Sequence, residues 1–432
     1  MKTFIITGIQ MRNKGSQAMF LSLSYSLKSI YGECEIIGFA NKYDSPEQYT
    51  FTLYPYDEFT RPVLKHGLYK FPFLVCALTR VVGHLRKKDK WQNKITEMKK
   101  ALQRADAIFD ASGYTLGSGW PKSSGKMLLD TIRIARRFNK KIILMPQSFG
   151  PFEWGEKNDS AFLDEAKKEL TYPLIIYARE TEGYRCLTSL GLNNVELSAD
   201  MVIREKIFPT PSQIRIDYRA GSKAFPKQNS VGFIINKNVF RIGDPSVVID
   251  LYAKILQKLI DSGENVYILT TSTADTDLVQ QVLAKVENGP KAHVISGEFS
   301  SPELIEIIAR FKYVVASRYH SVVFAYRNGV PAVILGWASK YTDLAALFNQ
   351  QDYVFDIRSP NVAKIIGGLE KIRVNYEEES ERIKENLKSV QATSVVLQAT
   401  RALEEQDLSA TIPAHRPFAS SRGNGQASAM TV

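Results

Sequence analysis

The chain of 432 residues has only three cysteines, Cys34, Cys76 and Cys186, which lie far apart and follow no metal-ligand spacing. An odd number of irregularly spaced cysteines argues against a disulfide framework and favours reduced thiols in a cytoplasmic protein. No apolar run approaches the roughly 20 residues that cross a bilayer. The apolar run after Met1 is too short for the core of a signal peptide. We therefore expect a cytoplasmic protein without a structural metal or a membrane span.

Two common phosphate-binding motifs are missing from the first strand, loop and helix. The sequence predicts a strand over Thr3–Gly8, a polar loop over Ile9–Ser16 and a helix over Gln17–Tyr31. The loop lacks both Gly-x-Gly-x-x-Gly and the Walker lysine, so it supports neither a standard dinucleotide site nor a P-loop. Its glycine, Gly15, is explained equally well by a tight turn and by close approach to a ligand.

Sequence signals for nucleic-acid binding are also lacking. We find no zinc-finger spacing, no aromatic RNA-binding run and no dense basic block, so nucleic acid is not an expected partner. The formal charge of +11 is spread over the whole chain and suits anionic ligands or an anionic membrane surface. The basic run Arg86–Lys88 is either a peripheral contact to the inner face of a membrane or a solvated helix face.

Alternating strand and helix patterns predict an α/β protein with two domains. A chain of this length exceeds one ordinary core. Residues 206–229 carry prolines and charges with little apolar periodicity, and they form the expected linker. The predicted division is an N-terminal Rossmann-like domain over 1–205, a C-terminal one over 230–360, helices over 361–405, and a disordered tail over 406–432. Two doubly wound sheets would then face a cleft.

Three segments are predicted to interrupt the regular pattern. Asn41–Trp91 is rich in Pro, Tyr and Phe and reads as an insertion or a mobile flap. Gly113–Gly125 reads as a glycine-rich loop that admits close approach by a ligand or is a plain surface excursion. The strand Lys141–Met145 is expected to break at Pro146.

The stretch Tyr313–Leu335 predicts a strand, a short polar step, a helix and a second strand. Arg318 and His320 fall where the first strand meets the helix. Ligands bind at the carboxyl ends of parallel strands, and a helix N-terminus favours an anion. We therefore predict an anion site there, with a proton-donating role for His320. The alternatives are an ordinary ion pair for Arg318 and capping or packing for His320.

Arg179 repeats the placement of Arg318, because it ends the predicted strand Leu174–Arg179 just before a helix. Two arginines in matching positions of two strand-helix units are less easily explained as ordinary surface charges. Asp200 ends the predicted strand Val195–Asp200, and it is either a catalytic group or a helix cap and ion-pair partner.

Taken together, these segments resemble the polysaccharide pyruvyl transferase family. The resemblance follows the family order over roughly residues 3 to 350. Its most specific part is Arg318-Tyr-His320 with the downstream Gly329-Val-Pro331. The other matching pieces are Asn13–Ala18, Asp110–Gly113, Met145–Pro151, Ala178–Glu180 with Leu187–Gly191, Ser198–Asp200, and the extension to Lys340.

The resemblance implies a fold of the GT-B glycosyltransferase type and transfer of pyruvate from phosphoenolpyruvate onto sugar hydroxyls as a ketal. It implies that Arg179 and Arg318 hold the donor and that His320 is the general acid. Neither a cofactor nor a metal is required by this scheme. The residues expected to contact substrate are Asn13, Gly15, Ser16, Ser112, Gly113, Arg179, Gln147, Asp200 and Lys340. A turn at the end of a strand is the alternative for Gln147, and a solvated lysine is the alternative for Lys340.

The sequence departs from the family pattern at two positions. Many members have Asp where Ser16 stands, and a second glycine where this chain has Tyr114. Ser16 keeps a hydroxyl but loses a negative charge, which removes any base role carried by that acid.

Two other functions stay open on the sequence. A glycosyltransferase that uses a nucleotide sugar would have the same architecture, and a non-catalytic carbohydrate-binding relative would keep the fold. For pyruvyl transfer, the expected partners are phosphoenolpyruvate and a saccharide acceptor, free or lipid-linked, from a cell-surface polysaccharide pathway. The acceptor sugar, the hydroxyls used and the oligomeric state are not predicted.

Overall fold

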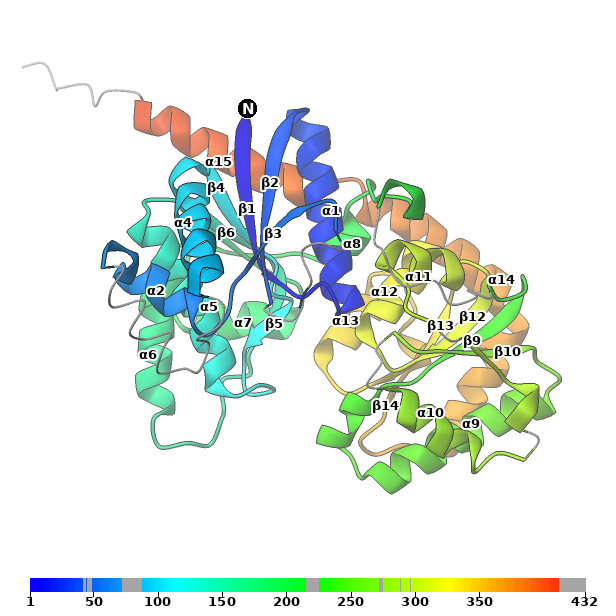
Figure 1. Cartoon of the computed structure of the whole chain (residues 1–432). Coiled ribbons are helices and arrows are strands. Elements are labelled where there is room, and N and C mark those ends of the chain that lie inside the picture. The colour runs from blue at the N-terminus through cyan, green and yellow to red at the C-terminus, as the bar shows by residue number, and fades with distance from the viewer. Residues whose placement is uncertain are drawn as a thin grey trace, which may run out of the picture.

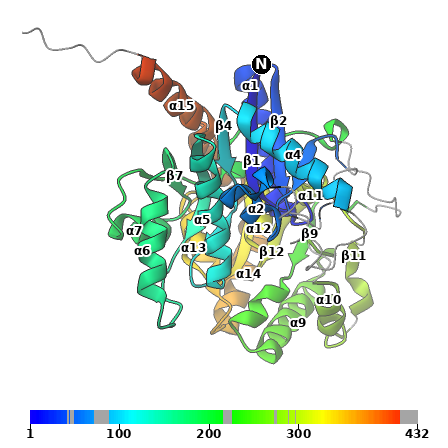
Figure 2. The same ribbon diagram turned by 60° about the vertical axis from the view of Figure 1, so that its left-hand side comes forward.

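Two parallel sheets, one in each half of the chain, form the framework of the protein (Figure 1). The computed structural model describes residues 1–41, 44, 49–71, 88–214, 225–271, 275–287, 289–295 and 297–411. Figure 2 shows the same two bodies turned, with the second sheet and its helices below the first. This arrangement confirms the predicted α/β class with two doubly wound sheets.

The first sheet has eight strands, and its paired neighbours all run parallel. The strand order is β3-β2-β1-β4-β6-β7-β8, and the short strand β5 is outside this order because, among the described strands, it pairs only with β6. Parallel strands need helical crossovers, which place helices on both faces and bury the strands. The strands are β1 (Lys2–Ile9), β2 (Cys34–Ala40), β3 (Thr52–Pro55), β4 (Ala107–Asp110), β5 (Tyr114–Leu116), β6 (Lys141–Phe149), β7 (Ile175–Ala178) and β8 (Val195–Leu197).

The second sheet has six parallel strands in the order β11-β10-β9-β12-β13-β14. The order reverses direction at β9 and β12, so the carboxyl ends of these two strands flank the crevice where such sheets bind ligands. The strands are β9 (Ser230–Ile234), β10 (Val266–Leu269), β11 (His293–Ile295), β12 (Phe311–Ala316), β13 (Ala332–Gly336) and β14 (Val354–Asp356).

The helices that cover the sheets follow the apolar periodicity of the sequence. In the first half they are α1 (Lys14–Tyr31), α2 (Thr60–His66), α4 (Lys88–Arg104), α5 (Lys122–Arg137), α6 (Asp159–Leu170), α7 (Thr181–Ser189) and α8 (Met201–Arg204). In the second half they are α9 (Pro245–Asp261), α10 (Thr276–Leu283), α11 (Ser301–Ile308), α12 (Tyr319–Arg327), α13 (Ser339–Ala346), α14 (Val362–Val390) and α15 (Val395–Thr411).

One hydrophobic core cluster joins the two halves. It includes Phe4 of the first sheet, Phe20 of α1, Met201 of α8 and Ile334 of the second sheet. Of the last two helices, one packs on the second half and the other on the first half. Helix α14 packs against β12 and β13, whereas α15 returns to α1 (Figure 1). The boundaries predicted at residues 205, 230 and 360 stay predictions.

Several predicted elements begin or end elsewhere in the structure. Helix α1 begins at Lys14, so Gly15 and Ser16 lie in its first turn and not in a loop, because the side chain of Asn13 caps it. Strand β6 runs through Pro146 to Phe149. Its pairing with β7 shifts register between Leu144 and Gln147, and such an irregularity accommodates a residue that lacks an N–H.

The segments predicted to be irregular contain regular elements. The predicted insertion over 41–91 includes β3, α2 and the start of α4, and the predicted glycine-rich loop includes β5 and the start of α5. Strand β8 ends at Leu197, so Asp200 is the N-cap of α8 and not a strand end.

Some predictions lie wholly or partly outside the described residues. They concern residues 72–87 of the insertion or flap predicted over 41–91, which include Arg86 and Lys87 of the basic run, the linker stretch 215–224 and the tail from 412 onward. Helix α15 itself continues to Thr411, beyond the predicted start of the tail. None of the helices in the described ranges is long and apolar enough to cross a membrane.

Candidate active site

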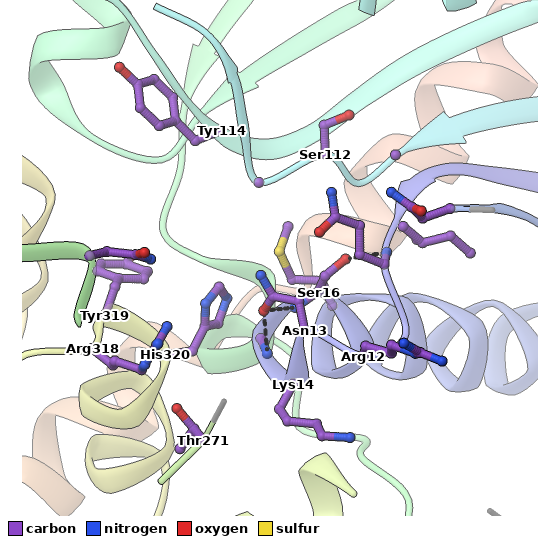
Figure 3. A pocket seen from close by; sticks show the side chains of 18 of the residues that line it. Arg12, Asn13, Lys14, Ser16, Ser112, Tyr114, Thr271, Arg318, Tyr319 and His320 are labelled. Atoms are coloured by element: carbon purple, nitrogen blue, oxygen red, sulfur yellow. Dashed lines mark hydrogen bonds between the residues drawn. The ribbon is translucent and has the colours of Figure 1, made fainter. Parts of the chain in front are cut away.

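A cavity of about 1310 Å³ lies between the two halves, at the carboxyl ends of strands from both sheets. Figure 3 shows residues from the loop after β1, the loop after β4 and the start of α12 around it. Of the residues predicted to contact substrate or catalyse, those that line the cavity are Asn13, Gly15, Ser16, Ser112, Gly113, Arg179, Arg318, His320 and Lys340. Gln147 and Asp200 lie beneath its surface.

His320 lies where the first turns of two helices meet. It is in the first turn of α12, and its ring faces Gly15 in the first turn of α1. A Cβ on Gly15 would lie 2.2 Å from Nδ1 of His320, so the glycine is required for this close approach. The positive ends of two helix dipoles therefore point toward one region of the cavity and favour an anion there.

Asp200 connects the two halves beneath the cavity. Its side chain is 0% exposed, and it accepts hydrogen bonds from Arg179 Nη1 at 3.0 Å and from the Val202 N–H at 2.9 Å. Its Oδ2 lies 3.5 Å from Nε2 of His320. Burial alone raises a carboxyl pKa, but His320 and Arg179 outweigh it and hold the pKa of Asp200 below its usual value. Asp200 therefore serves as a helix cap and an ion-pair partner in this structure, and its predicted substrate contact stays a prediction.

Arg179 is a buried guanidinium with fixed partners. Its Nε donates to Ser148 Oγ at 2.9 Å, and Nη1 donates to Asp200. Its plane lies over the ring of Tyr319, 4.5 Å from the ring centre. For Nη2 the described part of the chain contains no hydrogen-bond partner, so this nitrogen is available to a ligand.

Arg318 is the N-cap residue of α12, and its side chain is paired with a buried acid. Its Nε and Nη2 donate to Oδ2 of Asp275 at 2.7 and 2.5 Å, and that side chain is 0% exposed. Asp275 also accepts a hydrogen bond from the Lys237 N–H. The ion-pair alternative for Arg318 therefore holds, and the side chain still lines the cavity with Nη1 free of hydrogen bonds within the described ranges.

Lys340, from the first turn of α13, lies among three tyrosine rings. Its Nζ is 5.6 Å from the ring centre of Tyr114, 5.5 Å from that of Tyr319 and 5.8 Å from that of Tyr341. Burial, and then the charge of Arg179, lower the pKa of Lys340 to about 8. Tyr114, which replaces the second glycine of the family pattern, thus contributes one wall of this aromatic enclosure.

Asn13 and Ser16 have structural partners at the start of α1. Oδ1 of Asn13 accepts from the N–H groups of Gly15 and Ser16, and Oγ of Ser16 accepts from the N–H of Gln10. These bonds satisfy donors that a helix end leaves free. Both side chains hold the helix end against the cavity, and Ser16 places no negative charge there.

Gln147 lies below the floor of the cavity and does not line it. The side chain is 0% exposed, and Nε2 donates to Oδ1 of Asp110 at 3.1 Å. The same carboxylate accepts from the Thr7 hydroxyl and from the Ser112 N–H. Because β6 continues past Pro146, Gln147 is part of the strand and supports the loop that carries Ser112 and Gly113.

Sequence reasoning missed the partners that position the cationic groups. Ser148 and Asp275 hold the two arginines, and Glu180 accepts from Ser148 Oγ at 3.0 Å while burial raises its pKa. Glu180 and Tyr319 belong to the family segments, which is a signal that could have found them. Asp275 lies just before a predicted helix, and an acid at that position is normally interpreted as a helix cap.

The described part of the chain contains no group of three or more His, Cys, Asp or Glu side chains that could hold a metal ion. The expectation that the reaction needs no metal and no cofactor stays a prediction.

The fold is that of two-domain α/β proteins of the GT-B type. Staphylococcus aureus MnaA with UDP superposes with a TM-score of 0.55 at 8% identity, over 95% of this chain and 97% of that chain. UDP-GlcNAc 2-epimerase from Neisseria meningitidis gives a TM-score of 0.54 at 11% identity, over 93% and 99%. Anabaena Alr3699/HepE with UDP gives 0.51 at 11% identity, over 95% and 100%. At these identities the likeness concerns the fold alone.

A sequence profile of the polysaccharide pyruvyl transferase family matches residues 13–339, and the chain belongs to that family. Membership assigns it to the transferases. A curated relative, the amylovoran biosynthesis protein AmsJ of Erwinia amylovora, is 24% identical over 139 residues. That match covers 31% of this chain and 34% of the relative, about a third of its length.

Gly15→Ala is expected to displace the imidazole of His320, because the added Cβ would lie 2.2 Å from Nδ1. The control is Gly367→Ala in α14, where a Cβ meets nothing within 4 Å. Helix propensity should then raise the control's stability by about 0.5–1 kcal/mol, whereas overpacking by Gly15→Ala costs about 1–3 kcal/mol. The measurements are thermal unfolding and the NMR signals of selectively labelled histidines, of which the chain has 5. Unchanged His320 signals in Gly15→Ala would refute the contact.

Proposed function

We propose that this protein transfers pyruvate from phosphoenolpyruvate onto a sugar of a cell-surface polysaccharide or of its lipid-linked precursor, forming a ketal. The observation that carries the proposal is the convergence of Arg179, Arg318, Lys340 and His320 on one cavity between the two halves. Family membership supports the pyruvyl group as the one transferred.

The donor chemistry suits the charges of the cavity. Phosphoenolpyruvate carries a phosphate and a carboxylate, and guanidinium groups bind both through directed N–H donors. Arg179 comes from the first half and Arg318 from the second, and each is held by a buried acid, so their donors are fixed before the ligand arrives. Lys340 adds a cation that lies among three aromatic rings.

The reaction begins with protonation of the donor. His320 donates a proton to the methylene carbon of phosphoenolpyruvate, which leaves a cationic carbon at the neighbouring position. A sugar hydroxyl attacks that carbon, and its proton passes to the imidazole of His320, which the first step left neutral. The bond between this carbon and the phosphate oxygen then breaks, and phosphate leaves with the electron pair. A second hydroxyl attacks the same carbon, gives its proton to the departing phosphate and closes the ketal. Oδ2 of Asp200 lies 3.5 Å from Nε2 of His320, so this carboxylate stands next to the proposed acid.

Donor binding tests the proposal directly. Isothermal titration should detect phosphoenolpyruvate and should detect neither UDP-sugars nor GDP-sugars. At 100 times its Kd the donor should also raise the free energy of unfolding by about 2.7 kcal/mol. Selective binding of a nucleotide sugar would move the protein to the glycosyltransferases, and binding of a saccharide without a donor would indicate a non-catalytic relative.

Arg318→Gln is expected to weaken phosphoenolpyruvate binding at least about tenfold, because a charge-assisted hydrogen bond is lost. The double variant Arg318→Gln/Asp275→Asn removes both charges of the buried pair and separates loss of binding from loss of stability. Arg358→Gln, which breaks the exposed pair with Asp356, should leave binding unchanged. Equal donor affinity in all variants would refute the arginine assignment.

His320→Gln is expected to lower turnover by a factor of about 10²–10⁴, the usual contribution of a general acid. Donor affinity should change little, because the cationic groups that bind it are retained. His293→Gln, on an exposed residue of β11, is the control. Turnover is followed as phosphate release in the presence of acceptor, and equal rates for the two variants would remove the acid assignment.

Donor affinity is expected to fall as the pH rises through about 8, because the pKa of Lys340 is lowered to about 8 and an amine is cationic only below its pKa. Between pH 7 and 9 the cationic fraction of such an amine falls about tenfold. Lys340→Arg keeps its charge over this range and should flatten the profile. A flat profile for the wild type would contradict a charged role for Lys340.

A further inference from the structure

The cavity also extends over the first sheet to α2 and α5, away from His320. Tyr56, Asp57, Arg61 and Thr131 line it there, and we call this group the α2 subsite. In Figure 1, α2 lies in the first half, apart from α12 of the second half, which carries His320. At about 1310 Å³ the cavity exceeds the roughly 300–1,000 Å³ of ordinary ligand pockets, so it leaves room for more than a three-carbon donor.

Arg61 is the unusual member of the subsite, because it is buried without a counter-ion. Its residue exposure is 9%, its Nη1 donates to the carbonyl oxygen of Tyr56 at 3.1 Å, and its guanidinium lies 5.6 Å from the centre of the Tyr56 ring. The other buried basic residues described here, Lys14, Lys122 and Arg179, each have a carboxylate within 4.0 Å. Across the described ranges, Arg61 has none.

Two acids stand close to Arg61 in sequence, Asp57 and Glu58, and both line the cavity, but neither forms an ion pair with its guanidinium. Oδ1 of Asp57 accepts from the N–H groups of Phe59 and Thr60 and from the Thr60 hydroxyl, so it caps the start of α2. It forms no ion pair with Arg61. The Tyr56 and Thr131 hydroxyls are hydrogen-bonded to each other at 3.0 Å, which fixes the polar surface beside the guanidinium.

We propose that Arg61 binds an anionic group of the acceptor saccharide, either the carboxylate of a uronic acid or the phosphate of a glycosyl phosphate. The inference rests on the proposed function, which requires an acceptor in this cavity. A buried guanidinium without a counter-ion has a desolvation cost that its charge does not recover, and a bound carboxylate or phosphate offsets that cost through two directed hydrogen bonds. The donor is not the expected ligand, because it has its own cations at the opposite end of the cavity.

The test is isothermal titration of the full chain with methyl β-D-glucuronide, α-D-glucose 1-phosphate and the neutral methyl β-D-glucoside. Saturating phosphoenolpyruvate is present, so that the donor cations are occupied. At least one anionic probe should bind about tenfold tighter than the glucoside, as expected for one charge-assisted interaction. The tighter of the two identifies the anion as carboxylate or phosphate.

Arg61→Gln should remove this preference and leave glucoside and phosphoenolpyruvate affinities unchanged. Arg61→Lys should keep part of it. Arg137→Gln is the matched control, because Arg137 also donates to a backbone carbonyl of α2 but does not line the cavity. Equal affinity of all three probes for the wild type, or an unchanged preference in Arg61→Gln, would overturn the proposal.

The donor and acceptor assignments can fail separately. Absence of phosphoenolpyruvate binding would refute the proposed function, and the Arg61 comparison would then be repeated without it. In that case the difference between wild type and Arg61→Gln still isolates the subsite. Loss of glucuronide or glucose 1-phosphate preference in the Arg137→Gln variant would assign the effect to α2 packing and overturn the role of Arg61.

Discussion

The buried carboxylate of Asp200 is the interaction on which the site depends. It has no contact with solvent, and removing one partner of such a charge typically costs about 3–5 kcal/mol. Its partners come from both halves of the chain, Arg179 after β7 and His320 at the start of α12. The position of the imidazole in the cavity is therefore set by contact between the two halves, and opening them would separate the proposed acid from its counter-ion.

The segment after Asp200 is fixed on both sides. Arg327 of α12 donates to the carbonyl oxygens of Val202, Glu205 and Lys206, and burial lowers its pKa to about 10. Glu205 in turn accepts from Ser26 of α1 and from Ser394 just before α15. Helix α8 is thus tied to elements of both halves, next to the residue that connects them. Hydrogen bonds on both sides of α8 thus hold the contact between the two halves next to the site.

The sequence predicted most of the alternating strands and helices and the strand-end positions of Arg179, Arg318 and His320, because these follow from local pattern. Alternating strand and helix periodicity placed both sheets, and Arg179, Arg318 and His320 fall at strand ends that parallel topology brings together. Contacts between residues far apart in the sequence could not be predicted from local patterns. Asp275 is 43 residues from Arg318, and nothing in the local sequence distinguishes it from a cap. Gln147 was misplaced because Pro146 suggests a strand end, whereas a register shift keeps the strand intact.

The charges of the cavity divide into those already paired and those that are not. Arg179 and Arg318 are each held by a buried acid, so they orient a ligand through fixed donors but add little uncompensated charge. Lys340 lies among aromatic rings, and Arg61 has only a carbonyl and a ring as neighbours, with no ion pair for either in the described part of the chain. Because Ser16 replaces the acid that many family members have, the net charge of the cavity is more positive. In the proposed reaction, the paired arginines would thus provide directional recognition, and Lys340 and Arg61 would contribute electrostatic attraction of anions at the two ends of the cavity.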